Sequence, residues 1–118
     1  MITVNDDNIM ISQGDVINKY FYVPGYTLDA GDKFYFTVSK IERDGSKTVK
    51  LNVEMQPVED EAKNCFLYLD VTSEQTKNLQ VSTDDNVYAY DVHFVRGQNK
   101  FALNYVKAFV VKGVAHNV

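Results

Sequence analysis

The sequence predicts an all-β, antiparallel fold, either a sandwich or a barrel, and three observations support this prediction. Aromatic and β-branched residues alternate with other residues along several short stretches, most regularly over residues 87–95, as in strands with one buried face. The chain contains 8 Tyr and 7 Phe but no Trp, and aromatic residues favour strands. Clusters of Gly, Pro, Asn and Asp separate the alternating stretches at short intervals.

Seven strands are expected, with one short helical turn before the sixth. The predicted strands cover residues 8–12, 16–23, 33–41, 48–55, 65–71, 87–95 and 101–111. Residues 73–79 are polar apart from Leu79, so they predict one or two helical turns that Leu79 anchors. The sixth stretch is expected to be the central strand. Residues 57–64 are acidic and irregular, which indicates a loop.

Turn residues and side-chain alternation define how these strands pair and which faces they bury. Asp44-Gly45 and Gly97-Gln98 each lie between two strand-like runs and predict hairpins, which make the neighbouring strands antiparallel. The expected core faces of four strands consist of Phe34, Phe36 and Val38; Val49, Leu51, Val53 and Met55; Cys65, Leu67, Leu69 and Val71; and Tyr88, Tyr90, Val92 and Phe94.

Length and charge restrict the classes of protein that the chain can represent. A chain of 118 residues is long enough for one normal core, so residues 1–118 are expected to form a single domain. The net charge of -4 argues against a nucleic-acid partner. No stretch reaches the 18 or so apolar residues of a membrane span. The first residues do not resemble a signal peptide, so we expect synthesis and folding in the cytoplasm.

No residue pattern indicates catalysis, a cofactor or a metal. His93 and His116 lie far apart, and Cys65, which is the only cysteine, has no partner at metal-ligand spacing or for an internal disulfide. No Ser or Cys nucleophile motif and no glycine-rich phosphate loop occurs. Asp70 and Asp91 interrupt apolar strands. We expect Asp70 to point outward and Asp91 to be partly buried in a structural role.

Eight Tyr residues are more than the core of one sandwich usually holds, so some are expected at the surface. An exposed Tyr serves either as an anchor in a protein interface or as a platform for a sugar ring. Our interface prediction names Ile9 and Ile11 in the first strand, taken as a sheet edge that could accept an added strand. The outer residues of the last strand are taken as the other edge. Tyr26 and Tyr105 are predicted to be exposed anchors.

Four segments together resemble a known family. They are IMISQGDVINKYFYV (residues 9–23), KFYFTVSKI (33–41), SEQTKNLQVSTDDNVYAYDVHFV (73–95) and FALNYVKAFVVKG (101–113). They are similar to the immunoglobulin-like N-terminal domain of phage baseplate upper proteins. The most recognisable piece is the strand beginning Tyr88-Ala89-Tyr90-Asp91. The chain departs from the family at Lys107, where Gly is common, and at residues 84–86, which replace the usual Pro-Gly.

The resemblance implies an immunoglobulin-like β-sandwich of about seven strands in a structural protein of a phage or prophage virion. Such a protein would be assembled in the cytoplasm of a bacterial host and would work as a non-enzymatic baseplate or tail adaptor. Its expected partners are other virion or tail proteins, or further copies of itself. The alternative prediction is a carbohydrate-binding sandwich, which needs coplanar exposed Tyr rings along a groove. A small enzyme is a third class that no residue pattern supports.

Overall fold

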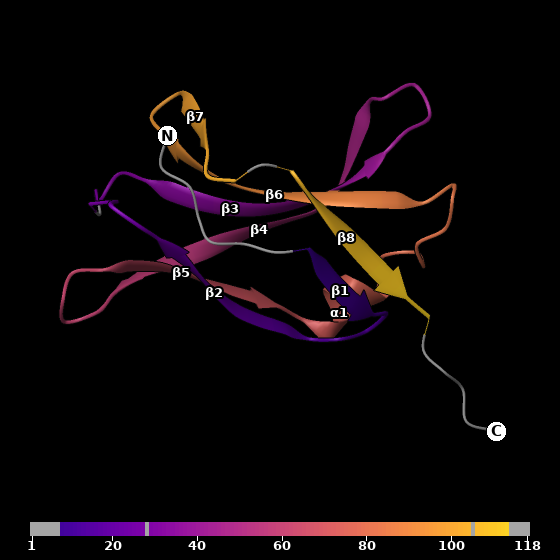
Figure 1. The fold of residues 1–118 in the computed structure, drawn as a ribbon, viewed down its shortest axis with the longest axis horizontal. Coiled ribbons are helices and arrows are strands. Elements are labelled where there is room, and N and C mark those ends of the chain that lie inside the picture. The colour runs from indigo at the N-terminus through magenta and orange to yellow at the C-terminus, as the bar shows by residue number, and fades with distance from the viewer. Residues whose placement is uncertain (1–7, 28, 105, 114–118) are drawn as a thin grey trace.

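The computed structural model describes residues 8–27, 29–104 and 106–113 of the chain. These residues form eight strands and one short helix, shown in Figure 1. In chain order they are β1 (Ile9–Ser12), β2 (Ile17–Val23), β3 (Lys33–Ile41), β4 (Lys47–Glu59), β5 (Cys65–Val71), α1 (Ser73–Lys77), β6 (Val87–Arg96), β7 (Asn99–Ala102) and β8 (Lys107–Lys112).

The strands follow one another in the order β1-β8-β6-β3-β4-β5-β2, and β7 pairs with β6 beside this path. All these pairs are antiparallel except β1 with β8, which is parallel. The long strand β4 takes part in two ladders, pairing with β3 up to Met55 and with β5 from Gln56 onward. The sheet therefore folds over at β4 into two layers, with β3 and β6 in one and β2 and β5 in the other (Figure 1).

Aromatic side chains from both layers fill the space between them. Phe21 of β2 packs against Phe36 of β3 and Tyr90 of β6, with ring centroids 6.3 and 6.5 Å apart. Phe109 of β8 contacts the rings of Phe36 and Tyr90. All four side chains are almost completely buried. The predicted core faces of β3, β5 and β6 are confirmed, because every residue named on them is buried.

The helical turn predicted before the sixth strand is α1. Its N-cap is Thr72, whose hydroxyl accepts from the backbone N–H of Gln75, while the Gln75 side chain accepts from the backbone N–H of Thr72. This reciprocal capping satisfies two of the N–H groups that a helix start leaves unpaired. Leu79 follows the helix and is 2% exposed, as expected of the apolar anchor. Among the described residues, no helix has the length and apolar character needed to cross a membrane.

One predicted core residue of the fourth strand, Val49, is on the wrong face. The β3–β4 register pairs Val38 with Leu51 but Ser39 with Val49, so Lys50 is an extra residue in β4. Such a β-bulge exchanges the two faces of the strand beyond it, because side chains alternate with a period of two. Val49 is consequently 59% exposed, whereas Leu51 and Met55 are buried as predicted.

The predicted loop over residues 57–64 is partly strand, because β4 extends to Glu59. Pro57 pairs with Leu67 of β5, while the pairing of β4 with β3 has already ended at Met55. At this point β4 has a neighbour on one side only among the described residues, and a residue without an N–H donor is tolerated there.

The predicted last strand over residues 101–111 is two strands, β7 and β8, and the strand count is eight. Between them, the N–H of Leu103 donates to the carbonyl of Val92 at 2.8 Å, and the Oδ1 of Asn104 accepts from the N–H of Val92 at 2.7 Å. The Asn104 side chain thus replaces a backbone partner and interrupts the ladder. The prediction that the last strand is a sheet edge is wrong for β8, which lies between β1 and β6, but holds for β7, which pairs with β6 alone among the described strands.

Candidate functional site

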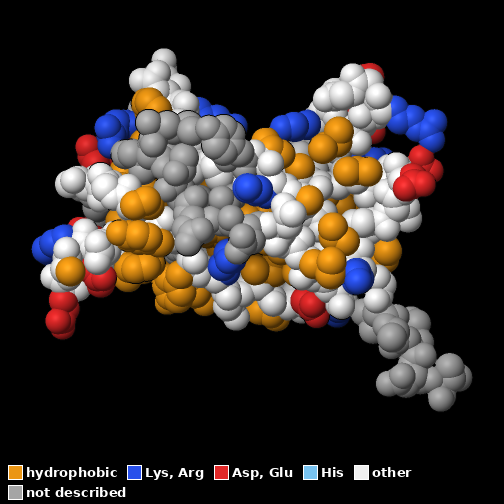
Figure 2. Space-filling view, in the orientation of Figure 1, with side chains coloured by type: hydrophobic (Ala, Val, Ile, Leu, Met, Phe, Trp, Pro, Cys, Tyr) orange, Lys and Arg blue, Asp and Glu red, His pale blue; other side chains and the backbone are white. Residues whose placement is uncertain are grey.

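The outward side of β2 and β5 carries the largest group of exposed aromatic side chains that the described residues show. We call this surface the tyrosine face. It consists of Tyr20 and Tyr22 of β2, Phe66 and Tyr68 of β5, and Val58 at the end of β4. Tyr20 is 59% exposed, Val58 44% and Tyr22 37%. Hydrophobic side chains gather at the lower left of Figure 2, in the region of β2 and β5.

Strand register brings these side chains together. Tyr20 lies opposite Tyr68 and Tyr22 opposite Phe66 in the β2–β5 ladder. The Tyr20 and Tyr68 ring centroids are 4.8 Å apart, and those of Tyr22 and Phe66 are 5.2 Å apart. Cross-strand aromatic pairs of this kind stabilise a sheet by about 0.2–1 kcal/mol. They also hold the rings in a defined arrangement before any partner arrives.

Hydrogen bonds within the protein already occupy two of the Tyr hydroxyls. The Tyr68 hydroxyl donates to Oδ1 of Asn18 at 3.1 Å, and the Tyr22 hydroxyl donates to Oδ1 of Asn64 at 3.4 Å. Asn64 is oriented by Asp60, whose carboxylate accepts from its backbone N–H and from its side-chain amide. These bonds also hold the pKa of the Asp60 carboxyl below its ordinary value. The tyrosine face is therefore apolar at its centre with polar amides at its rim.

The strand that carries Tyr20 and Tyr22 is also an end of the sheet. Among the described residues, β2 pairs only with β5 and ends the strand order opposite to β1. One side of its backbone thus presents N–H and C=O groups that no described strand pairs. Such an edge is a template for adding a strand from another chain.

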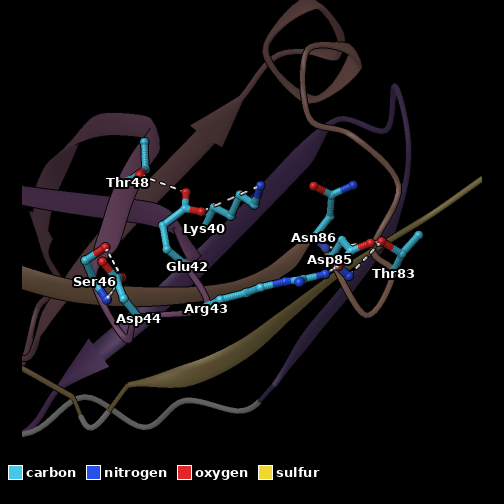
Figure 3. Close-up of polar contacts among 9 residues, drawn as sticks. All are labelled: Lys40, Glu42, Arg43, Asp44, Ser46, Thr48, Thr83, Asp85 and Asn86. Atoms are coloured by element: carbon cyan, nitrogen blue, oxygen red, sulfur yellow. Dashed lines mark hydrogen bonds and ion pairs between the residues drawn. The ribbon is translucent and has the colours of Figure 1, made fainter.

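A second surface feature is an open cleft of about 630 Å³ between the β3–β4 hairpin and the turn before β6. Figure 3 shows most of its charged groups, four of which form two ion pairs. The Arg43 guanidinium lies 2.6 Å from the Asp85 carboxylate, and the Lys40 ammonium lies 3.8 Å from Glu42. Asp44 accepts from the Ser46 hydroxyl and backbone N–H, which lowers the pKa of its carboxyl. Exposed pairs of this kind contribute little to stability.

The cleft offers no chemistry that would single it out as an active site. In the part of the chain that the structure describes, no group of three or more His, Cys, Asp or Glu side chains could hold a metal ion. Away from the cleft, the Nδ1 of His93 lies 2.8 Å from Asp91, and the His93 ring stacks on Tyr35. His93 is thus held by neighbouring side chains. Asp91 is partly buried and Asp70 is exposed, as predicted.

The prediction that Tyr26 is an exposed anchor is wrong. Its side chain is 6% exposed, with its ring edge-on to Phe34 and Phe94 at centroid distances of 5.6 and 5.7 Å. Its hydroxyl bonds to the carboxylate of Asp32, which also receives two hydrogen bonds from Arg96. Burial is the main cause that raises the pKa of Tyr26 to about 12. The buried carboxylate supplies the hydrogen-bond partner that a buried Tyr hydroxyl needs.

The other three predicted interface residues have different outcomes. Tyr105 lies outside the described residues. Ile9 and Ile11 belong to β1, which does end the strand order, but Ile11 is buried and Ile9 packs against the core. At this edge a partner would meet the backbone rather than these side chains. The interface role of Ile9 and Ile11 stays a prediction.

The predicted interface residues include none of those that form the tyrosine face, although the alternation of β2 contained a signal for them. Val16, Asn18, Tyr20 and Tyr22 alternate with Ile17, Lys19, Phe21 and Val23, which places the two sets on opposite faces, but which set points outward was not predicted. The sequence does not show which strand pairs with β2. Only the register with β5 shows that Phe66 and Tyr68 lie beside these Tyr residues.

Comparison with known proteins identifies the fold but no family. No family model and no curated protein matches the chain. Among solved structures, it is similar to the crystal structure of the first Ig domain of the mouse polymeric immunoglobulin receptor. The identity is 12%, the TM-score is 0.50, and the match covers 98% of this chain and 97% of that one.

Features that mark the core of antibody domains have counterparts here that are built from other residue types. Antibody domains hold an inter-sheet disulfide against a buried Trp, with a Tyr two residues before the second Cys that bonds back to the backbone. Here the Tyr88 hydroxyl accepts from the backbone N–H of Gln80, and Tyr90 stands two residues later. Phe21 and Tyr90 meet across the two layers, with Phe36 beside both. The chain is an all-β, immunoglobulin-like sandwich whose inter-sheet connection is made of aromatic rings.

Proposed function

We propose that this chain is a non-enzymatic binding module that contacts a protein partner through the tyrosine face. The observation that carries this proposal is the exposure of Tyr20 and Tyr22 within a cluster of four rings on one side of the sheet. Tyr is enriched in protein interfaces because its ring supplies contact area while its hydroxyl satisfies a polar neighbour. On the outward side of the β2–β5 register the charged residue is Asp70, which lies opposite Asn18 beyond the rings, and interface cores are depleted of charge.

We propose further that the partner is another structural protein of a phage or prophage virion, with this chain acting as a baseplate or tail adaptor. The support for this setting is the resemblance of residues 9–23, 33–41, 73–95 and 101–113 to the immunoglobulin-like domain of phage baseplate upper proteins. In this setting the chain resides in the virion and is assembled in the cytoplasm of the bacterial host.

The geometry of the rings favours a protein over a carbohydrate. Sugar platforms require rings that lie nearly in one plane, but Tyr20 and Tyr68 are tilted by 39° and Tyr22 and Phe66 by 34°. The hydroxyls of Tyr22 and Tyr68 are engaged with Asn64 and Asn18. Burying hydroxyls that already have a partner avoids the desolvation cost of an unpaired polar group.

The test measures binding of the purified chain to intact tails from the phage or prophage that encodes it. We expect the double variant Tyr20→Ala/Tyr22→Ala to bind at least tenfold more weakly, because buried Tyr anchors each contribute more than about 1 kcal/mol. The matched control is Val49→Ala, which removes a side chain of equal exposure, 59%, from the other layer.

Two outcomes would contradict the proposal. Equal binding by the double variant and the wild type would exclude the tyrosine face as the contact. Failure of the wild type to bind tails would reject the virion setting. A glycan array probed with the wild type and with the double variant tests the carbohydrate-binding alternative. A sugar signal that the double variant loses would indicate that the tyrosine face binds a carbohydrate rather than a protein.

A further inference from the structure

A small pocket of about 140 Å³ lies where β4 approaches the segment after α1. It is lined by Lys50 of β4, by Asn78 and Gln80 of that segment, and by Tyr88 at the start of β6. A single water needs only about 10–15 Å³, so the pocket has room for a larger polar group. All four side chains carry hydrogen-bond donors. The pocket shares no residue with the tyrosine face or with the charged cleft.

Lys50 supplies the positive charge of this pocket. It is the extra residue that the β3–β4 register leaves in β4, and a β-bulge of this kind changes the direction of a side chain relative to a regular strand. Lys50 is exposed, and no carboxylate of the described residues pairs with its ammonium. The pocket therefore has a cation at its rim that is available to an anionic group.

The Tyr88 hydroxyl supplies a buried donor to the same pocket. The side chain is 3% exposed, and its oxygen accepts from the backbone N–H of Gln80 at 3.1 Å. A Tyr hydroxyl donates one hydrogen bond as well as accepting, and no described residue accepts from Tyr88. Because Gln80 also lines the pocket, the hydroxyl is the part of Tyr88 that reaches it. A ligand oxygen beside this hydroxyl would complete its hydrogen bonding.

We propose that this pocket binds a carboxylate group, with one oxygen facing the Lys50 ammonium and the other accepting from the Tyr88 hydroxyl. The side-chain amides of Asn78 and Gln80 can turn an N–H toward the same oxygens. Hydrogen bonds with an ionised partner are stronger than those between neutral groups. The bond from Gln80 already holds the Tyr88 hydroxyl in place, so little of its conformational freedom is lost on binding.

The charges around the pocket favour a carboxylate over a phosphate. Among the residues that line it, Lys50 is the one cation. Lys77, in the last turn of α1, has its ammonium 3.8 Å from Glu74 instead. α1 ends beside the pocket with Asn78 as its C-cap, and this end of a helix carries partial negative charge. One cation next to a helix C-terminus matches a single negative charge better than the nearly two charges of a phosphate group.

Acetate is the probe, and an NMR titration of the isotope-labelled chain at constant ionic strength measures its binding. We expect saturable shifts of the Gln80 backbone amide, with a Kd on the order of millimolar for so small a ligand. Lys50→Gln and Tyr88→Phe are each expected to raise this Kd at least about tenfold, because each removes a hydrogen bond to a charged group. Lys47→Gln is the matched control, since Lys47 is an exposed lysine of the same strand that does not line the pocket.

Four outcomes would overturn the proposal. Shifts that do not saturate with acetate would show that no site exists. Equal shifts with acetamide, which has the shape of acetate without its charge, would exclude an anion site. An unchanged Kd in Lys50→Gln would exclude these residues, and this exposed substitution decides even if Tyr88→Phe does not fold. Tighter binding of phosphate at the same residues would replace the carboxylate by another anion.

The carboxylate comes either from a free acid or from an Asp or Glu side chain of a bound protein, and binding of phage tails distinguishes the two sources. If a tail protein supplies it, Lys50→Gln is expected to bind tails more weakly than Lys47→Gln, and acetate to compete with the tails. If it is a free acid, the two variants are expected to bind tails equally. Failure of the wild type to bind tails would reject the virion setting alone, because the acetate titration requires no tail protein.

Discussion

The hydroxyl of Tyr88, at the start of β6, accepts a hydrogen bond from the backbone N–H of Gln80 at 3.1 Å. This bond ties the segment after α1 to the strand that lies between β3 and β8. Tyr88 is 3% exposed whereas Gln80 is exposed, so the bond joins a buried side chain to a surface segment. Burial also raises the pKa of the Tyr88 hydroxyl above its ordinary value.

Tyr88→Phe is expected to lower the free energy of unfolding by about 1 kcal/mol, the usual net value of one hydrogen bond, with the fold retained. The measurement is urea denaturation followed by circular dichroism. Tyr20→Phe is the control, because an exposed substitution of this kind changes stability by less than about 0.5 kcal/mol. Equal effects of the two substitutions would show that the bond to Gln80 contributes nothing.

The Asp32 carboxylate is expected to make stability depend on pH in acid. Its hydrogen bonds from Arg96 are the main cause that lowers its pKa below the ordinary value of 3.8, and burial opposes them. Because the folded state favours the carboxylate, the stability it contributes is complete above pH 3.8 and is lost as the pH falls through the lowered pKa. Urea denaturation from pH 7 to pH 2 measures this loss.

Asp32→Asn is expected to flatten this acid decline, since an amide does not titrate. Asp70→Asn is the control, because Asp70 is an exposed carboxylate. At pH 7, Arg96→Ala is expected to destabilise more than Asp32→Asn, since it leaves a buried carboxylate without its cation, whereas Arg96 is half exposed and can be hydrated. An unchanged acid decline in Asp32→Asn would contradict the assignment.

Local patterns predicted the strand faces because alternation reports directly which side of a strand is apolar. Tyr88, Tyr90, Val92 and Phe94 are all buried as predicted, although Ala89 and His93 on the opposite face of β6 are buried as well. Prediction failed where contact with a segment distant in the sequence determines the local strand structure. Lys50 becomes a bulge only through the register with β3, and Asn104 ends β7 because Val92 lies beside it.

The same limit of local sequence patterns applies to the candidate site. Tyr20 lies within a predicted strand and Tyr26 follows the Pro24-Gly25 turn, but the residue type does not show which of the two side chains is exposed. Tyr26 is buried because Asp32 supplies a partner for its hydroxyl inside the protein, whereas Tyr20 projects from the outer face of an end strand. Side-chain exposure at such positions follows from tertiary partners rather than from residue type.

The aromatic connection between the two layers is expected to be sensitive to ring size. Phe36 is completely buried and contacts the rings of Phe21, Tyr90 and Phe109. Phe36→Ala is expected to cost about 3–5 kcal/mol through lost burial and the cavity that remains, and Phe36→Leu to cost less. Urea denaturation measures both. Phe101→Leu is the control, because Phe101 is 43% exposed, and a similar loss there would contradict a central role for Phe36.

The turn between β1 and β2 requires glycine at position 14, and a second glycine provides the contrast. Gly14 has φ +89°, and a Cβ added there would lie 3.5 Å from Cγ of Lys77, which is ordinary contact. The cost of Gly14→Ala is therefore backbone strain, about 1–2 kcal/mol for a left-handed conformation.

Gly31 has no such φ, and an added Cβ would meet Asp29 Oδ1 at 3.7 Å. Gly31→Ala is expected to stabilise by about 0.4–1 kcal/mol by restricting the unfolded chain. Thermal and urea unfolding of both variants measures the difference, and equal signs would contradict the account. Since the Asp15 carbonyl, next to Gly14, accepts from the Thr76 hydroxyl at 2.6 Å, the strain at Gly14 is also expected to loosen α1.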